Sequence, residues 1–132
     1  MKTSKSAREA LENSRTKIQE AAETLFRAKE EARRVPWGHF AAMDVHAATD
    51  NIATACHCVA NARSCIQKAK MAETTDRENW YDDLVQENCK NADCFAEKAL
   101  SDARSALAKA TDPRRPFIAR AEAARWQAAG AN

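Results

Sequence analysis

The sequence predicts an all-α protein: an antiparallel helical bundle of three long helices plus a short C-terminal helix. The chain has 132 residues, a length that suits a single domain over residues 1–132. It contains only two glycines and three prolines, too few for the many turns of a sheet protein. Most of its 45% hydrophobic fraction is alanine, the strongest helix former, and apolar residues recur in steps of three and four.

The first helix is predicted over residues 6–35. Ser6 and Glu9 have the spacing of a capping box, in which each side chain binds a free backbone N–H of the first turn. Pro36 and Gly38 end the helix. Between these signals a heptad pattern marks the face that should be buried: Ala7, Leu11, Ser14, Ile18, Ala21, Leu25, Ala28, Ala32 and Val35.

The second helix is predicted over residues 40–72, and the third over residues 76–110. The heptad seam of the second consists of Val45, Ala48, Ile52, Ala55, Val59, Ala62, Ile66 and Ala69. A capping box at Thr75 and Glu78 opens the third helix. Its seam includes Cys89, which is predicted to be buried, and consists of Tyr81, Val85, Cys89, Ala92, Ala96, Ala99, Ala103, Ala106 and Ala110. The short connections make neighbouring helices antiparallel.

A short fourth helix is predicted over residues 113–128. Asp112 followed by Pro113 has the pattern of an N-cap with proline at the first helical position. Phe117, Ile118 and Trp126 would form its apolar side. An alternative is that this alanine-rich tail frays, because a helix of this length is marginal alone.

Charge is distributed unevenly along the chain, although the net charge is only +2. Residues 1–34 carry nine Lys or Arg against six Asp or Glu, residues 113–132 carry four against one, and residues 76–112 carry five against nine. The molecule should therefore have basic ends and an acidic third helix. The N-terminus has no apolar signal region, and no stretch approaches the roughly 20 apolar residues of a membrane span, so we expect a cytoplasmic protein without membrane contact.

The cysteines and histidines are the first candidates for chemistry. Cys56, Cys58, Cys65, Cys89 and Cys94 form no C-x-x-C pair and are odd in number, which suits a reducing compartment. A site between helices that uses these thiols and His57 stays an alternative to plain buried or surface cysteines. His46 and Asp50 have the i, i+4 spacing of a two-ligand metal site, but a solvated polar face is favoured. No cofactor is predicted.

One hexapeptide has a catalytic pattern. The segment Arg34-Val35-Pro36-Trp37-Gly38-His39 fits the spacing Arg-x4-His and resembles the signature of the HEPN family of helical-bundle ribonucleases. The resemblance implies that Arg34 and His39 act as a catalytic pair at RNA phosphates. It departs from the family pattern at Pro36 and Gly38, which break the helix that should carry both side chains. The alternative is that Trp37 and Phe40 close the end of the bundle while Arg34 caps the first helix, and a non-enzymatic protein is predicted.

Two charged surfaces are predicted to bind macromolecules. Arginine can contact phosphates in a bidentate way and tryptophan can stack on unpaired bases, so the nucleic-acid-binding candidates are Arg114, Arg115, Arg120, Arg125 and Trp126, with Lys5, Arg8 and Arg15 as an extension. Aromatic side chains within a charged rim are typical of protein interfaces, so the protein-interface candidates are Asp76, Glu78, Trp80, Tyr81, Asp82, Asp83 and Glu87. The alternative, which is the more common outcome for such aromatic residues and the one expected here, is that Trp80 and Tyr81 enter the core at the start of the third helix.

These observations favour a binding protein that presents charged helical faces to a protein partner or to single-stranded nucleic acid. In size and all-helical build the chain resembles the small inhibitors of phages and mobile elements, including anti-CRISPR proteins. The resemblance implies that it blocks a bacterial nucleic-acid-guided defence complex, and it transfers no functional residue. The long seams allow either a monomer or a homodimer.

Overall fold

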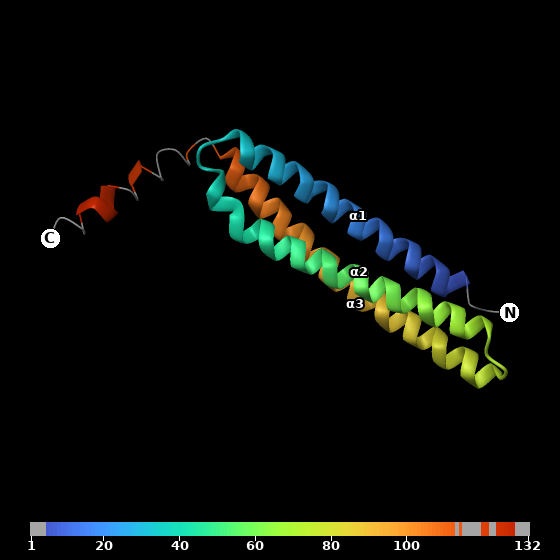
Figure 1. The fold of residues 1–132 in the computed structure, drawn as a ribbon. Helices are drawn as coiled ribbons and strands as arrows, with labels where there is room; N and C mark the ends of the chain where they lie inside the picture. Colours follow the sequence, from blue (N-terminus) through green and yellow to red (C-terminus); the bar gives the residue numbers. More distant parts are fainter. Residues whose placement is uncertain (1–4, 113, 115–119, 122–123, 129–132) are drawn as a thin grey trace.

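The computed structural model describes residues 5–112, 114, 120–121 and 124–128. Its elements are α1 (Lys5–Arg34), the short 3-10 helix η1 (Gly38–Ala41), α2 (Ala42–Lys70) and α3 (Thr75–Thr111). No strand occurs in this described part, so the prediction of an all-α protein is confirmed. The long helices lie side by side as a rod, and consecutive helices run in opposite directions (Figure 1). None of the described helices is apolar over a length that would cross a membrane.

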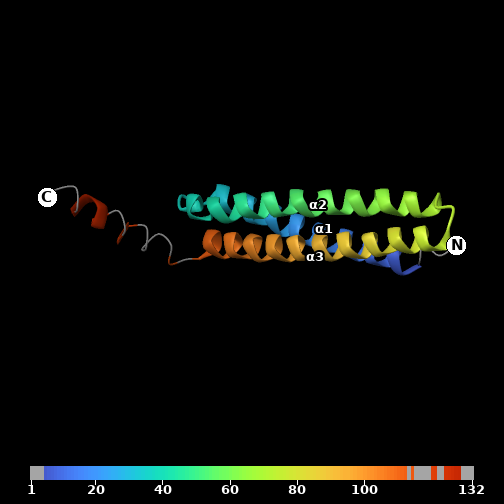
Figure 2. The same cartoon turned by 90° about the horizontal axis from the view of Figure 1, so that it is seen from below.

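Helix α3 packs against both of the other long helices. Both α1 and α2 contact α3 more extensively than they contact each other. Seen from below, α2 and α3 run side by side along their lengths, and α1 crosses behind them at a shallow angle (Figure 2). The side of the rod between α1 and α2 is therefore the least covered part of the apolar seams.

The core is built mostly from alanine. Buried positions along α3 include Ala92, Ala96, Ala99, Ala103 and Ala106, and those of α2 include Ala48, Ala55, Ala62 and Ala69. The largest side chains with less than 2% exposure are only a valine and a serine, Val85 and Ser14. Because alanine ends at Cβ, the helix backbones can approach closely, and close packing then leaves no room for a larger side chain.

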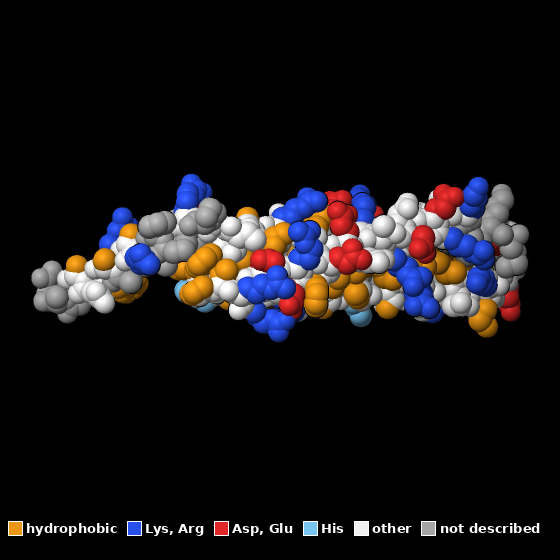
Figure 3. Space-filling model, turned by 90° about the horizontal axis from the view of Figure 1, so that it is seen from above, with side chains coloured by type: hydrophobic (Ala, Val, Ile, Leu, Met, Phe, Trp, Pro, Cys, Tyr) orange, Lys and Arg blue, Asp and Glu red, His pale blue; other side chains and the backbone are white. Residues whose placement is uncertain are grey.

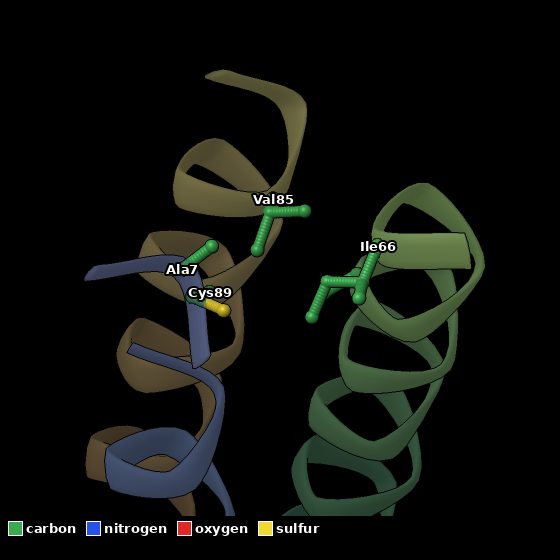
Figure 4. Packing of buried hydrophobic residues seen from close by; sticks show 5 residues of the cluster. Ala7, Ile66, Val85 and Cys89 are labelled. Carbon is green, nitrogen blue, oxygen red and sulfur yellow. The ribbon is translucent and has the colours of Figure 1, made fainter. Parts of the chain in front are cut away.

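Two of the larger buried side chains, Ile66 and Val85, lie where α1 begins. Ile66 of α2 and Val85 of α3 point toward each other, and Ala7 of α1 lies beside Cys89 (Figure 4). Cys89 is 2% exposed, as its place in the seam predicts. Burial raises the pKa of its thiol, so Cys89 stays protonated at neutral pH.

The predicted helix ranges agree with the structure within two residues, but two caps were assigned to the wrong residue. Ser6 lies inside α1, where its hydroxyl oxygen accepts from Gln86 Nε2 at 3.2 Å and ties α1 to α3. The N-cap of α3 is Thr74 rather than Thr75, because Thr74 has the extended backbone that a cap requires and accepts from the backbone N–H of Arg77 at 3.1 Å. In the sequence only Thr75 has a glutamate three residues later, so the capping-box pattern pointed to the wrong one of two adjacent threonines.

The predicted helix over 113–128 lies partly outside the described residues, as do Phe117 and Ile118. Arg120, Ala121 and residues 124–128 are helical and exposed. Asp112 has extended backbone at the end of α3, and its Oδ1 accepts from the backbone N–H of Arg114 at 2.9 Å. That bond is one that an N-cap aspartate makes.

Polar side chains fix the register between the alanine seams. Between α1 and α3, the fully buried Ser14 hydroxyl donates to Asp93 Oδ1 at 2.7 Å. Between α2 and α3, Asn51 Nδ2 donates to Asp102 Oδ2 at 3.2 Å. Alanine seams alone would allow helices to slide by a heptad, and a buried polar group that has its partner in one register only prevents this.

The pair Asp44 and Lys109 forms the same kind of link near the start of α2. Lys109 Nζ lies 2.7 Å from Asp44 Oδ2, and the Ser105 hydroxyl donates to the same oxygen at 3.0 Å. These donors, with the Lys109 hydrogen bond as the largest cause, hold the pKa of Asp44 below its ordinary value. The ionised carboxylate is therefore the form that stabilises the fold.

Replacing Asp44 by asparagine should make stability less dependent on pH. The folded pKa of Asp44 lies below its unfolded value, so the stabilisation is complete above the unfolded pKa of about 3.9 and is lost as the pH falls through the folded pKa. At pH 7 we expect Asp44→Asn to lower the free energy of unfolding by about 1–2 kcal/mol. Urea unfolding at a series of pH values checks this.

The matched control for this test is Asp50→Asn, an exposed carboxylate on the same helix. The stability gap between the wild type and Asp44→Asn should narrow below about pH 4, because both proteins then lack the charge. A gap of constant size across that range would contradict the assigned role of the Asp44 carboxylate.

Candidate functional site

Four side chains at the start of α3 form an exposed charged surface, which we call the acidic ridge: Asp76, Trp80, Asp83 and Glu87. Their spacing of i, i+4, i+7 and i+11 places them on one face of the helix. The buried side chains Val85 and Cys89 of the same helix face the core, so the ridge points away from α1 and α2. The structure thus brings together four of the seven residues predicted as a protein interface.

Trp80 is the aromatic centre of the acidic ridge. It is 54% exposed, so the expectation that it enters the core is wrong, whereas Tyr81 is half-buried. The two rings meet edge to face with centroids 5.0 Å apart. This contact holds the indole against the bundle and leaves much of its surface in water, which is the arrangement of an interface anchor.

Asp82 lies beside the ridge in a crowded group of carboxylates. Its Oδ1 is buried, with no hydrogen-bond partner among the described residues. Burial, together with the nearby charges of Glu78 and Asp83, raises the pKa of Asp82. A cation placed here by a partner would relieve this repulsion.

A hollow lies at the turn between α2 and α3, at the same end of the rod. It has a volume of about 570 Å³ and is lined by Lys68, Met71, Ala72, Glu73, Thr74, Arg77 and Tyr81. Met71 is 81% exposed. Tyr81 joins the hollow to the ridge, because its ring contacts Trp80. Exposed apolar surface from Trp80 and Met71 therefore lies beside the carboxylates at this end of the molecule.

The basic candidates are distributed over both ends of the rod. Lys5 and Arg8 lie at the start of α1, whereas Arg114 directly follows α3, which ends at the opposite end (Figure 1). Arg114 is bound to the Asp112 carboxylate. Arg120, Arg125 and Trp126 are exposed, Trp126 by 79%, and Arg115 lies outside the described residues. Lys5 and Arg8 thus form no common surface with Arg114.

Arg34 and His39 lie on different elements. Arg34 is the last residue of α1, and its guanidinium Nη1 lies 3.3 Å from Glu31 Oε1. His39 belongs to η1, where its ring lies 4.2 Å from that of Phe40. The Trp37 indole between them donates to the Ala110 carbonyl at 3.1 Å and so ties this corner to the end of α3. The corner is built as the closed end of a bundle.

The described residues hold no group of three or more metal-ligating side chains. Cys56 and Cys94 are exposed and Cys58 and Cys65 half-buried, all as free thiols. His46 Nε2 and Asp50 Oδ2 lie 3.4 Å apart on the exposed side of α2. Comparison with protein-family models, curated proteins and solved structures finds no match.

Sequence reasoning missed a groove between α1 and α2, here called the α1–α2 groove. It has a volume of about 670 Å³ and is lined by Phe26, Lys29, Glu30, Ala32, Arg33, Gly38, Ala42 and Val45. Figure 3 looks onto the α1 side and shows exposed hydrophobic side chains among groups of Lys and Arg and of Asp and Glu. The signal was Phe26, a large apolar residue outside the heptad seam, which is 64% exposed.

Proposed function

We propose that the chain is a non-enzymatic binding protein that uses the acidic ridge of α3 to engage a basic surface on a partner protein. An antiparallel bundle of three long helices would be its rigid scaffold. The observation that carries the proposal is the 54% exposure of Trp80 within a stripe of exposed carboxylates. An aromatic anchor with a charged rim is the usual composition of a binding hot spot.

The electrostatics of the ridge favour a basic partner. The carboxylates of Asp76, Asp83 and Glu87 share one face, and burial and like charge already raise the pKa of nearby Asp82. An arginine of the partner could lie over the Trp80 ring and pair with Asp83, which joins a cation–π contact to an ion pair. Charge complementarity of this kind speeds association and suppresses wrong partners.

A partner protein that binds nucleic acid carries a surface rich in arginine and lysine, which is the kind of surface that the acidic ridge would engage. The resemblance to anti-CRISPR inhibitors would direct the acidic ridge at such a surface on a nucleic-acid-guided complex, where the carboxylates would take the place of phosphates. The assignment to such a complex follows from size and helical build alone. Binding of a labelled basic peptide tests the acidic ridge independently of that assignment.

A second candidate function is direct binding of single-stranded nucleic acid by the C-terminal residues. It is favoured by the exposure of Arg120, Arg125 and Trp126, since exposed arginine and tryptophan can contact phosphates and stack on bases. Because such binding releases counterions, it should weaken steeply with salt.

Variants of the two surfaces should separate these functions. We expect a labelled arginine-rich peptide to bind the wild type, and Trp80→Ala or the triple variant Asp76→Asn, Asp83→Asn, Glu87→Gln to weaken binding about tenfold or more. All four side chains are exposed, so the fold should tolerate the changes. Fluorescence anisotropy at two salt concentrations measures the affinity.

The matched control is the double variant Arg114→Ala, Arg115→Ala, which should bind the peptide as the wild type does. The same proteins are then titrated with labelled single-stranded DNA, RNA and duplex DNA. If the arginine variants lose nucleic-acid binding and the ridge variants bind the peptide unchanged, the second candidate replaces the first.

A further inference from the structure

Five of the larger apolar side chains in the seams of α1 and α2 lie toward the α1–α2 side of the rod and are only half-buried. They form an aliphatic stripe that consists of Leu11 and Ile18 of α1 and Val45, Ile52 and Val59 of α2. Val45 and Ile52 pack against the cluster that contains Leu25 of α1, and Leu11 packs against the cluster that contains Ile66. A bundle normally buries its large apolar side chains in the core, whereas here most of the buried residues are alanines and these five larger side chains are partly exposed. The apolar seam is thus wider than three helices cover.

Phe26 extends this apolar surface at the end where α1 meets η1. Its side chain is 64% exposed and lines the α1–α2 groove together with Ala32, Ala42 and Val45. A volume of about 670 Å³ is large enough to hold several apolar side chains of a partner. The groove and the stripe lie along the same pair of helices, which is the position that a fourth helix occupies in a four-helix bundle.

The rim of this apolar surface is mainly basic, and the one carboxylate among the residues that line the groove, Glu30, is paired with Arg33. The stripe is bordered on its outer side by the positions that lie three residues before, or four residues after, its seam positions on each helix. These are 8, 15, 22 and 29 on α1, and 42, 49, 56, 63 and 70 on α2. These nine positions carry no acidic residue and five basic ones: Arg8, Arg15, Lys29, Arg63 and Lys70. Arg15 has only a weak exposed pair, 4.0 Å from Glu12. The rim therefore favours an occupant with negative charge on both sides of an apolar stripe.

We propose that the face between α1 and α2 binds an amphipathic helix with acidic flanks from a partner protein, which completes a four-helix bundle. Its apolar residues, spaced as in a heptad, would cover Phe26, Val45 and the aliphatic stripe, while its carboxylates pair with Lys29 on one side and Arg63 on the other. This face lies opposite the acidic ridge on α3, so the inference does not depend on the proposed function.

Charge argues against the two occupants that the chain itself could supply. Residues 113–132 contain apolar side chains, but they carry four arginines and one glutamate, so they would bring positive charge to a basic rim. A second copy that placed its own α1–α2 face here would set Lys29 and Arg63 against the same set of cations. Like charges brought together at an interface that excludes water repel each other and disfavour this arrangement.

The test uses the full chain and two labelled model peptides of about 21 residues, each with leucine at the heptad a and d positions. The acidic peptide carries glutamate at e and g, and the basic peptide carries lysine there. We expect the wild type to bind the acidic peptide, and Phe26→Ser to weaken this at least about tenfold. The double variant Lys29→Glu, Arg63→Glu should lose the acidic peptide and gain the basic one.

The matched control is the double variant Arg27→Glu, Lys90→Glu, which changes the net charge by the same amount at exposed positions away from the groove. It should bind the acidic peptide as the wild type does. The ridge triple variant should also bind the acidic peptide normally, which separates this site from the proposed function. Equal binding of both peptides would overturn the proposal. So would the absence of binding at protein concentrations up to about 100 μM, since a Kd of that size corresponds to a binding free energy of only about 5.5 kcal/mol.

Three further results would assign the face to another occupant and also overturn it. One is concentration-dependent dimerisation of the wild type in sedimentation that Phe26→Ser abolishes, which would indicate a second copy. Another is tighter peptide binding by Trp126→Ala, which would indicate the chain's own C-terminal segment. The third is competition by unlabelled RNA at equal ionic strength, which would indicate a nucleic-acid groove.

Discussion

Replacing Gly38 by alanine is expected to lower the free energy of unfolding by about 3 kcal/mol and the Tm by roughly 10 °C. A Cβ at this position would lie 1.8 Å from the carbonyl oxygen of Ala32 and 2.6 Å from its carbonyl carbon. Both atoms belong to the backbone of α1, so no side-chain rotation can remove the clash. The corner formed by α1 and η1 must open instead.

Opening that corner would break a set of contacts at the end of the bundle. The Trp37 indole N–H would lose the Ala110 carbonyl, and Ala41 would separate from the cluster that contains Ala28 and Ala106. Calorimetry measures the change in Tm, and the indole N–H resonance of Trp37 reports the lost hydrogen bond. The control is Pro36→Ala, an exposed change in the same corner that places no atom against α1. A Gly38→Ala protein with the wild-type Tm would show that α1 and η1 are not in contact as described.

Replacing Ala99 by leucine should destabilise the protein at least as strongly, by about 3 kcal/mol or more. Ala99 is fully buried in the seam of α3, with α1 and α2 packed on that helix from two sides. The three added carbon atoms can fit only if a helix moves outward, and this would separate the neighbouring alanine contacts as well. A core that contains a cavity can gain stability from a larger apolar residue, whereas this close-packed core should lose it.

The same substitution at Ala108 is the control. Ala108 lies on the same helix but is exposed, so Ala108→Leu should change the free energy of unfolding by no more than about 0.5 kcal/mol. Urea unfolding of the two variants and the wild type gives the comparison. A stable Ala99→Leu protein would mean that the helices are further apart than the alanine core implies.

The fold could be predicted from sequence because the seams repeat without interruption. Heptad spacing identified Ala21, Ala62 and Ala103 as core, and Pro36 with Gly38 marked the end of α1. The pattern could not say which seam positions are fully buried, because that depends on how the helices are arranged around α3. Ile18 and Ala21 both belong to the heptad seam predicted for α1, yet only Ala21 is buried.

The acidic ridge was predicted in part, and the α1–α2 groove was not. Asp76, Trp80, Asp83 and Glu87 are neighbours along one helix, so local periodicity is enough to group them. Trp80 was expected in the core because large aromatic residues usually are buried, but the alanine core has no space for an indole. The groove joins Phe26 to Val45 of another helix, and such a pairing follows only from tertiary structure.

The alanine axis also bears on how this protein can change during evolution. From Ala92 to Ala110, each buried position of α3 is an alanine and admits little beyond alanine, glycine or serine, since neighbouring backbones fill the space around it. The outer positions carry no such restriction, because their side chains extend into water. Selection can therefore alter the charge and shape of every outward face, and so the choice of partner, while a narrow set of small residues preserves the rod beneath.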